Sequence, residues 1–130
     1  MNKIKKMQGS ALAVYDVDKQ KDLIVDLNYL VTTISTLGNN IIINNATNKK
    51  IAITNLFLNI IQHDSTSDLS ILVKSNTIDF ILLYLPKHGG SEQFSFSPEL
   101  AIKTLNGEDL IIILSDDLPL NVSVQYYYVD

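Results

Sequence analysis

Residues 99–114 read ELAIKTLNGEDLIIIL, two apolar runs separated by Asn106 and Gly107. A two-residue hairpin turn of type I′ needs positive φ at both central positions, and Asn-Gly adopts this conformation readily. The stretch therefore predicts an antiparallel hairpin in which Lys103 faces Leu110 across the two strands.

One face of this predicted hairpin is apolar, because Ile102 meets Ile111 and Leu100 meets Ile113. A slip of one residue would bury Lys103 in their place, so the register is well specified. We expect the apolar face to point into the core. Together with the alternation of the other apolar runs, it predicts a core of Ile53, Phe57, Ile71, Val73, Phe80, Leu82, Ile102, Ile111, Ile113, Val122, Val124 and Tyr126.

From residue 27 onward, short apolar runs alternate with turn signals such as LGNN (37–40) and HDSTS (63–67). Several short strands at this spacing indicate a sandwich or a barrel. We predict an all-β fold for residues 23–130, a single antiparallel β-sandwich that is jelly-roll-like and has about eight strands. Residues 1–22 are polar around one apolar patch, ALAVYDV (11–17), and are predicted to form an extended N-terminal arm.

The last predicted strand, LNVSVQYYYV (120–129), contains three consecutive tyrosines. Side chains alternate along a strand, so Tyr126 and Tyr128 share a face with Val122 and Val124. We therefore expect that face to belong to the core. Tyr127 is expected to point outward, where it could contact a partner.

The stretch DFILLYLP (79–86) is apolar on both faces. A strand of a two-layer sandwich normally keeps one wet face, so the second face needs a cover. The arm, a neighbouring subunit or a loop could supply it. This surplus of apolar surface favours a protein that assembles.

Composition narrows the possible functions of this chain of 130 residues, which is most simply one domain. The charged fraction of 18% lies below the usual value of about 25%. A net charge of −4 argues against a nucleic-acid partner, and the lack of cysteine excludes disulfides and thiolate metal sites. No apolar run approaches the roughly 20 residues that span a bilayer, and residues 11–15 are too short for the core of a signal peptide. We expect a soluble protein made in the cytoplasm without export.

Residues that could carry chemistry are few. His63 with Asp64 and Asp68 matches no metal-binding spacing, and Asp116 with Asp117 fits a turn better than a calcium site. The chain has no G-x-S-x-G elbow, no P-loop and no G-x-G-x-x-G motif. We therefore predict no enzyme, no metal site and no cofactor.

Sugar binding stays open as an alternative, because β-sandwich lectins use exposed aromatic residues and polar loops. Tyr15, Tyr29 and Tyr127 are the candidates, although the chain has no tryptophan.

The segments KIAITNLFLNI (50–60), LSILVKS (69–75) and DFILLYLPKHGGSEQFSF (79–96) precede SPELAIKTLNGEDLIIIL (97–114) and the final tyrosine strand. This succession resembles the auxiliary, or decoration, proteins of tailed-bacteriophage capsids of the crAss-like type. Pro98, Leu100, Gly107, Leu110 and the tyrosines carry the resemblance, which covers about the last two thirds of the chain.

The resemblance implies a structural virion protein on the capsid exterior, forming a homotrimer and bound to the major capsid protein or another virion protein. A tail, baseplate or head-fibre module is the first alternative, and a carbohydrate-binding module for host attachment is the second. The expected partner contacts are Leu12, Val14, Tyr15, His88, Gly89, Gly90 and Tyr127.

Overall fold

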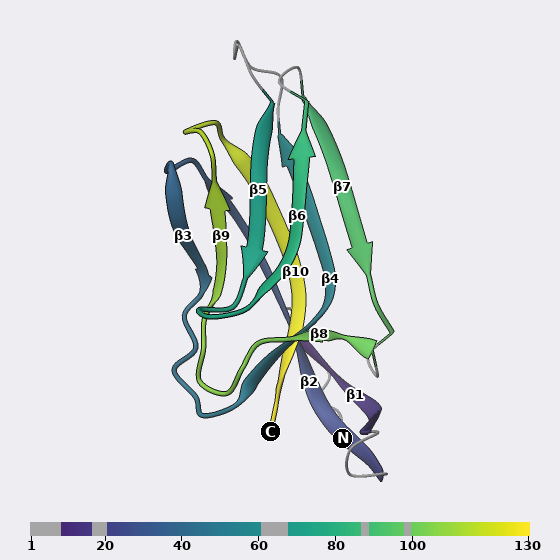
Figure 1. Cartoon of the computed structure of the whole chain (residues 1–130). Coiled ribbons are helices and arrows are strands. Elements are labelled where there is room, and N and C mark those ends of the chain that lie inside the picture. Colours follow the sequence, from purple (N-terminus) through teal and green to yellow (C-terminus); the bar gives the residue numbers. More distant parts are fainter. Residues whose placement is uncertain (1–8, 17–20, 61–67, 87–88, 98–99) are drawn as a thin grey trace.

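The computed structural model describes residues 9–16, 21–60, 68–86, 89–97 and 100–130, with side chains described from Val25 onward (Figure 1). These residues form ten strands: β1 (Gly9–Asp16), β2 (Lys21–Ile34), β3 (Gly38–Ile43), β4 (Lys50–Ile60), β5 (Leu69–Lys74), β6 (Asp79–Leu85), β7 (Gly90–Ser95), β8 (Ile102–Lys103), β9 (Leu110–Leu114) and β10 (Leu120–Val129). The described residues include no helix long and apolar enough to cross a membrane.

The strands form two antiparallel sheets that pack face to face. The six-stranded sheet has the order β1-β2-β10-β4-β7, and β8 pairs with β4 beyond the end of β7. The four-stranded sheet has the order β3-β9-β5-β6. Without β1 and β8, the other eight strands have the order of a jelly roll, β2-β10-β4-β7 against β3-β9-β5-β6. The prediction of a jelly-roll-like antiparallel β-sandwich is confirmed.

The main core lies between the two sheets and is built from aliphatic side chains. Central strands β4 and β10 bury Leu56, Leu58 and Ile60 against Leu120 and Val122, each at most 1% exposed. The four-stranded sheet contributes the other half of the layer from Leu69, Ile71, Val73, Leu110, Ile112 and Leu114. This burial supplies the main driving force for folding a chain without cysteine.

The prediction of a hairpin over residues 99–114 is wrong. The turn itself is present, since Glu108 N–H donates to the Leu105 carbonyl at 3.1 Å and Gly107 has a φ of 76°. However, β8 pairs with β4 in one sheet, whereas β9 pairs with β3 and β5 in the other. The chain crosses between sheets at this turn, as a jelly roll requires, so the two apolar runs never face each other.

Two expected core positions, Phe57 and Leu82, lie on the outer faces because their strands lose the regular alternation. In β4 the register shifts beside Gln125 of β10, so Thr54 and Asn55 both lie on the outer side. Phe57 is consequently 36% exposed, although the sequence predicted it inside. In β6 Leu82 is 59% exposed for a similar reason, since the pairing of β5 with β6 shifts between Val73 and Lys74.

On β9 the predicted inward face is also reversed. Leu110, Ile112 and Leu114 belong to the main core, so Ile111 and Ile113 lie on the outer face of the four-stranded sheet. Ile111 is nevertheless buried as predicted, with only 6% of its surface exposed. The prediction failed because it took the inward face from a hairpin that does not form.

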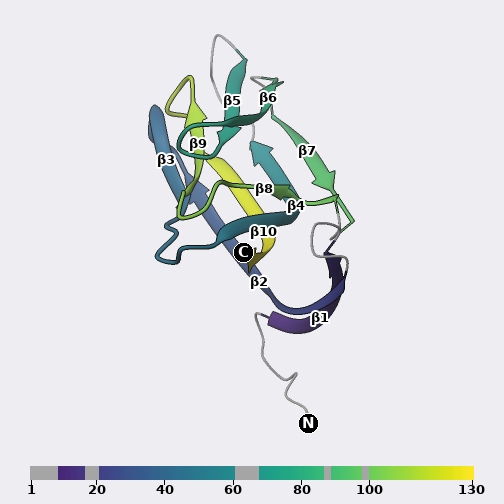
Figure 2. The same ribbon diagram turned by 60° about the horizontal axis from the view of Figure 1, so that its bottom comes forward.

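A second, smaller core lies on the outer side of the six-stranded sheet. It contains Val25 and Leu27 of β2, Ala52 of β4, and Tyr127 and Val129 of β10. The pairing of β2 with β10 ends at Asn28, and β2 continues towards its N-terminal end with β1 as its partner. Figure 2 shows β1 and this part of β2 curving away at the lower end of the sandwich.

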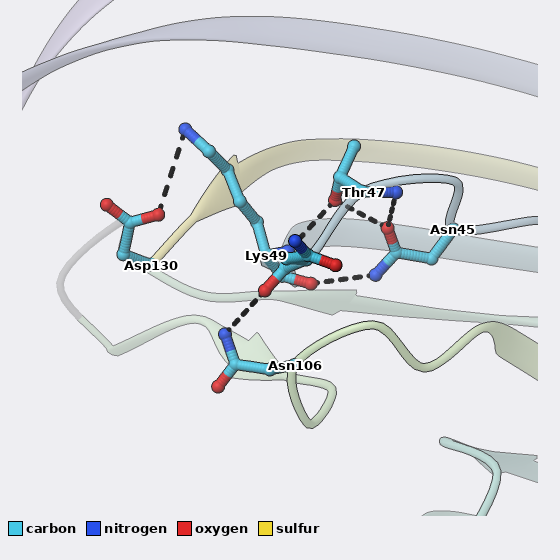
Figure 3. Close-up of polar contacts among 6 residues, drawn as sticks. Asn45, Thr47, Lys49, Asn106 and Asp130 are labelled. Carbon is cyan, nitrogen blue, oxygen red and sulfur yellow. Dashed lines mark hydrogen bonds and ion pairs between the residues drawn. The ribbon is translucent and has the colours of Figure 1, made fainter.

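A polar corner joins the loop after β3 to the loop before β9 (Figure 3). Asn45 is 8% exposed, and its Nδ2 donates to the carbonyls of Lys49 at 2.8 Å and Glu108 at 3.1 Å. Its Oδ1 accepts from the backbone N–H of Thr47 at 2.9 Å and from the Thr47 hydroxyl at 2.6 Å. The Asn106 side chain adds a bond to the carbonyl of Asn48 at 2.9 Å. The corner therefore fixes the chain where it crosses between the sheets.

The segment predicted as an extended arm, residues 1–22, contains β1 and the start of β2. The boundary expected between residues 22 and 23 falls inside β2, which is continuous from Lys21 to Ile34. Residues 9–16 thus extend the six-stranded sheet by pairing with β2 in register from Gly9–Asn28 to Asp16–Lys21.

Candidate interaction faces

The outer face of the six-stranded sheet carries a grid of uncharged side chains, which we call the amide face. Strand registers place three rows across β2, β10, β4 and β7. The rows are Tyr29–Gln125–Asn55–Ser95, Val31–Ser123–Phe57–Gln93 and Thr33–Asn121–Asn59–Ser91. Five of the twelve positions are amides, and none is charged.

A shallow hollow of about 100 Å³ opens in the amide face. Tyr29, Val31 and Phe57 stand around it, and the small side chain of Ser123 lies between Val31 and Phe57. Adjacent strands lie about 4.8 Å apart, so Val31 and Phe57 stand about 10 Å apart across β10. Tyr29 is 45% exposed and Val31 is 77% exposed, which leaves both available to a ligand.

A chain of hydrogen bonds fixes the polar edge of this hollow. The Thr54 hydroxyl donates to Oε1 of Gln125 at 2.8 Å, and Nε2 of Gln125 donates to the Tyr29 hydroxyl at 2.7 Å. Thr54 is 5% exposed and occupies the bulge in β4. The Tyr29 hydroxyl therefore accepts from Gln125 and keeps its own proton for another acceptor.

The outer face of the four-stranded sheet is different, and we call it the apolar face. It comprises Ile41, Leu72, Leu82, Tyr84, Ile111 and Ile113. The register places Ile113, Leu72 and Leu82 in one row across β9, β5 and β6. Ile41 is 58% exposed and Tyr84 is 66% exposed. Lys74 and Asp79 form an ion pair of 3.9 Å beside the apolar side chains.

A wider hollow of about 400 Å³ lies where β2 leaves β10, lined by Val25, Asp26, Asn28, Lys49 and Tyr128. Its two charged residues are of opposite sign, and Lys49 already lies 3.8 Å from Asp130. It offers no group of convergent donors or acceptors for one kind of ligand.

Acidic side chains do not form a metal site among the described residues. No group of three His, Asp or Glu residues there could hold a metal ion. Glu108 accepts from the hydroxyls of Ser75 and Thr77, and the Ser75 bond contributes most to lowering the pKa of its carboxyl. Tyr126 and Tyr128 make an edge-to-face contact with centroids 5.8 Å apart, and burial raises the pKa of Tyr126.

The arm residues predicted to contact a partner all lie on β1. Leu12 pairs with Val25, Val14 with Leu23, and Tyr15 with Asp22. Their side chains, and the whole of His88, lie outside the described part of the structure, so these contacts stay predictions.

Gly89 and Gly90 shape the connection from β6 to β7. Gly89 has a φ of 109°, and its N–H donates to the Pro86 carbonyl at 3.1 Å. Gly90 pairs with Ile60, and a Cβ there would lie 2.9 Å from Cδ of Pro86. Both positions are explained by this tight turn, and their contact with a partner stays a prediction.

Tyr127 is not the exposed contact that the sequence predicted. The alternation itself is right, since Tyr126 and Tyr128 pack against the main core and Tyr127 points to the outer side. However, Tyr127 is only 2% exposed, because Val25 and Leu27 of β2 help to enclose it in the second core.

Of the tyrosines considered for sugar binding, only Tyr29 lies on the amide face. Sequence reasoning missed Phe57 and Val31 beside it. The sequence does contain a signal for Phe57. The inward apolar residues of β4 are two positions apart except between Ile53 and Leu56, which are three apart, and this places Phe57 outside.

No protein-family model matches the chain, and no curated protein matches it. Solved structures that show remote likeness include the following three. A protein of the disulfide-linked pili of Bacillus endospore appendages has 9% identity and a TM-score of 0.48, with all of both chains covered.

A carbohydrate-binding module of Cellvibrio mixtus lichenase 5A, solved with cellotriose, has 6% identity and a TM-score of 0.34 over 97% of this chain and 91% of the other. Carbohydrate-binding and catalytic modules of a Clostridium thermocellum xylanase, solved with xylohexaose, have 10% identity and a TM-score of 0.30. The match spans 96% of this chain but 25% of the xylanase chain.

Proposed function

We propose that this chain is a structural protein that associates with copies of itself through the apolar face. More specifically, we propose that the chain is a decoration protein on the exterior of a tailed-phage capsid, bound to the major capsid protein or another virion protein. The observation that carries the coarser statement is the group of exposed side chains on the apolar face, Ile41, Leu82 and Tyr84.

The size of this exposure supports association. Leu82 and Tyr84 expose 59% and 66% of their surface, and Ile41 exposes 58%. Single apolar residues on a surface are ordinary, but several on one face of a sheet mark an interaction site. Leu72 and Ile113 extend the patch across two more strands.

Burial of these side chains would stabilise a complex appreciably. Covering a Leu or aromatic side chain completely is worth about 1.5–3 kcal/mol, so the exposed part of Leu82 is worth roughly 1–2 kcal/mol. Tyr84 contributes a similar amount. Association of this kind needs complementary apolar packing and no catalytic group.

The capsid as the site of assembly is supported by the sequence resemblance and not by the fold. A tail, baseplate or head-fibre module would present the same sandwich and could use the same face. Binding of the labelled protein to undecorated capsids, compared with isolated tails, distinguishes these alternatives.

The coarser proposal is tested by light scattering on the purified protein over a range of concentrations. We expect a defined oligomer, a trimer in the finer form, that the double variant Leu82→Ser/Tyr84→Ser converts to monomer. Loss of roughly 2–4 kcal/mol corresponds to an affinity about 30-fold or more weaker.

Val31→Ser is the matched control, since Val31 is 77% exposed but lies on the opposite sheet. It should leave the oligomer intact. A wild-type monomer at every concentration, or equal dissociation of the control, would show that the apolar face is not the interface.

A further inference from the structure

We propose that the amide face binds a neutral oligosaccharide, with part of one sugar ring entering the hollow between Tyr29, Val31 and Phe57. Asn55 and Gln125 would hydrogen-bond its hydroxyl groups. The amide face and the apolar face lie on opposite sides of the sandwich, so this site is independent of the proposed self-association.

The first observation is the lack of charge on the amide face. At the chain's charged fraction of 18%, about two of twelve surface positions would carry a charge, and surfaces usually carry more. None of the twelve positions does. A face without charge offers no counter-charge to the carboxylates of an acidic ligand, which would lose hydration without compensation, so it suits a partner that is polar and neutral.

The second observation is the chemistry of the polar groups. Each amide offers donors and an acceptor, and each hydroxyl offers both, which matches the hydroxyl groups of a sugar. Some of these groups are already oriented by neighbours: Gln93 donates to Asn55 at 3.4 Å, and Thr33 donates to Asn121 at 2.8 Å. Because an amide has more sites than these bonds use, capacity remains for a ligand.

The third observation is the pairing of apolar walls with a fixed polar edge. The Phe57 ring and the Val31 side chain border the hollow and can contact the apolar C–H faces of a sugar ring. The Tyr29 hydroxyl is held by Gln125, which Thr54 holds in turn. Tyr29 can therefore donate to a ring or hydroxyl oxygen without reorganisation, and preorganisation of this kind improves affinity.

The hollow of about 100 Å³ fits part of a ring and not a whole small molecule, since sites for drug-sized ligands measure about 300–1,000 Å³. The rest of the oligosaccharide would lie along the open rows of the face. Such a surface site is expected to bind weakly, with a Kd of about 0.1–1 mM for one oligosaccharide.

The test is a titration of the ¹⁵N-labelled full chain, followed by amide NMR, with cellohexaose, xylohexaose and maltohexaose, each to about 10 mM. We expect at least one of these probes to shift amide signals of β2, β4 and β10 around the hollow. Hexagalacturonate, the acidic probe, should bind at least tenfold more weakly.

Two variants test the proposed site, and a third serves as the matched control. Phe57→Ala and Tyr29→Phe should each weaken binding about tenfold, the second because it removes one hydroxyl donor. Tyr84→Phe makes the same chemical change on the apolar face and should bind like wild type. The NMR spectra of the unliganded variants verify that each is folded.

The proposal is overturned if none of the three neutral probes shifts these signals, or if the acidic probe binds as tightly as they do. Unchanged binding by both Phe57→Ala and Tyr29→Phe would overturn it as well. Signals of the amide face that shift with protein concentration alone would instead make it an interface between copies. A failed assembly test has no bearing on these outcomes, because it concerns the opposite face.

Discussion

Replacement of Asn45 by alanine should destabilise the protein strongly, although the residue lies in a loop. The Asn45 side chain makes four hydrogen bonds, two to carbonyls and two with Thr47. Asn45→Ala removes all four and leaves the Glu108 carbonyl and the Thr47 N–H without this partner. The Lys49 carbonyl keeps its second donor, the N–H of Gly107, at 2.9 Å.

The expected loss follows from these bonds. A protein hydrogen bond contributes about 0.5–1.5 kcal/mol, and a buried group left unpaired costs about 1–3 kcal/mol. The four bonds together are therefore worth about 2–6 kcal/mol. Because loops can relax and admit water to the unpaired groups, we expect the free energy of unfolding to fall by about 3 kcal/mol, in the lower half of this range. For a domain stable by roughly 5–15 kcal/mol, this is a large fraction.

Urea unfolding followed by circular dichroism measures this loss as a lower midpoint with an unchanged slope. Asn48→Ala is the matched control: Asn48 is exposed, and the corner uses its carbonyl and not its side chain. Its free energy of unfolding should stay within about 0.5 kcal/mol of wild type. An Asn45→Ala variant as stable as wild type, or a control equally destabilised, would refute the structural role of this corner.

Three further variants test other features of the fold, again by urea unfolding. Tyr127→Ala should lower the free energy of unfolding by about 3–5 kcal/mol, because the ring is enclosed in the second core, whereas an exposed ring would cost little. Gly107→Ala should cost about 1 kcal/mol, because alanine is strained at a φ of 76°; a cost near zero would contradict the turn. In wild type, hydrogen bonds led by that from Ser75 lower the pKa of Glu108 from its ordinary 4.5, so its stabilisation is present above that pH and lost as pH falls through the folded pKa. Glu108→Gln should therefore reduce the dependence of stability on pH below 4.5, and an unchanged dependence would contradict this assignment.

The sequence predicted the fold class because strand periodicity and turn chemistry are local signals. Asn106 and Gly107 do form a turn, and the alternation of Tyr126, Tyr127 and Tyr128 is correct. Pairing between strands is not local. The turn at Gly107 leads from one sheet to the other, and no feature within residues 99–114 distinguishes this crossing from a hairpin.

The inward face of a strand could also be predicted only in part from the sequence. Where both faces are apolar, as in β6, alternation gives two sets of residues but not the buried one. Ile81, Leu83 and Leu85 pack on the main core, while Leu82 and Tyr84 face outward. Tyr127 shows the complementary error, since an outward direction does not imply exposure when another segment of the chain covers it.

The bulge at Thr54 links the fold to the proposed sugar site. It breaks the alternation of β4, so that Ile53 and Leu56 both point inward and Asn55 stays outside. Without the break, one register of β4 would bury Asn55, and the cost of a buried unpaired amide would be high. The extra residue in the strand also places the Thr54 hydroxyl on Gln125 and thereby fixes the Tyr29 hydroxyl at the hollow. Bulges often redirect side chains beside functional sites. Here the same bulge lets the apolar side chains before and after it point into the core, and it orients Tyr29, the one tyrosine of the amide face.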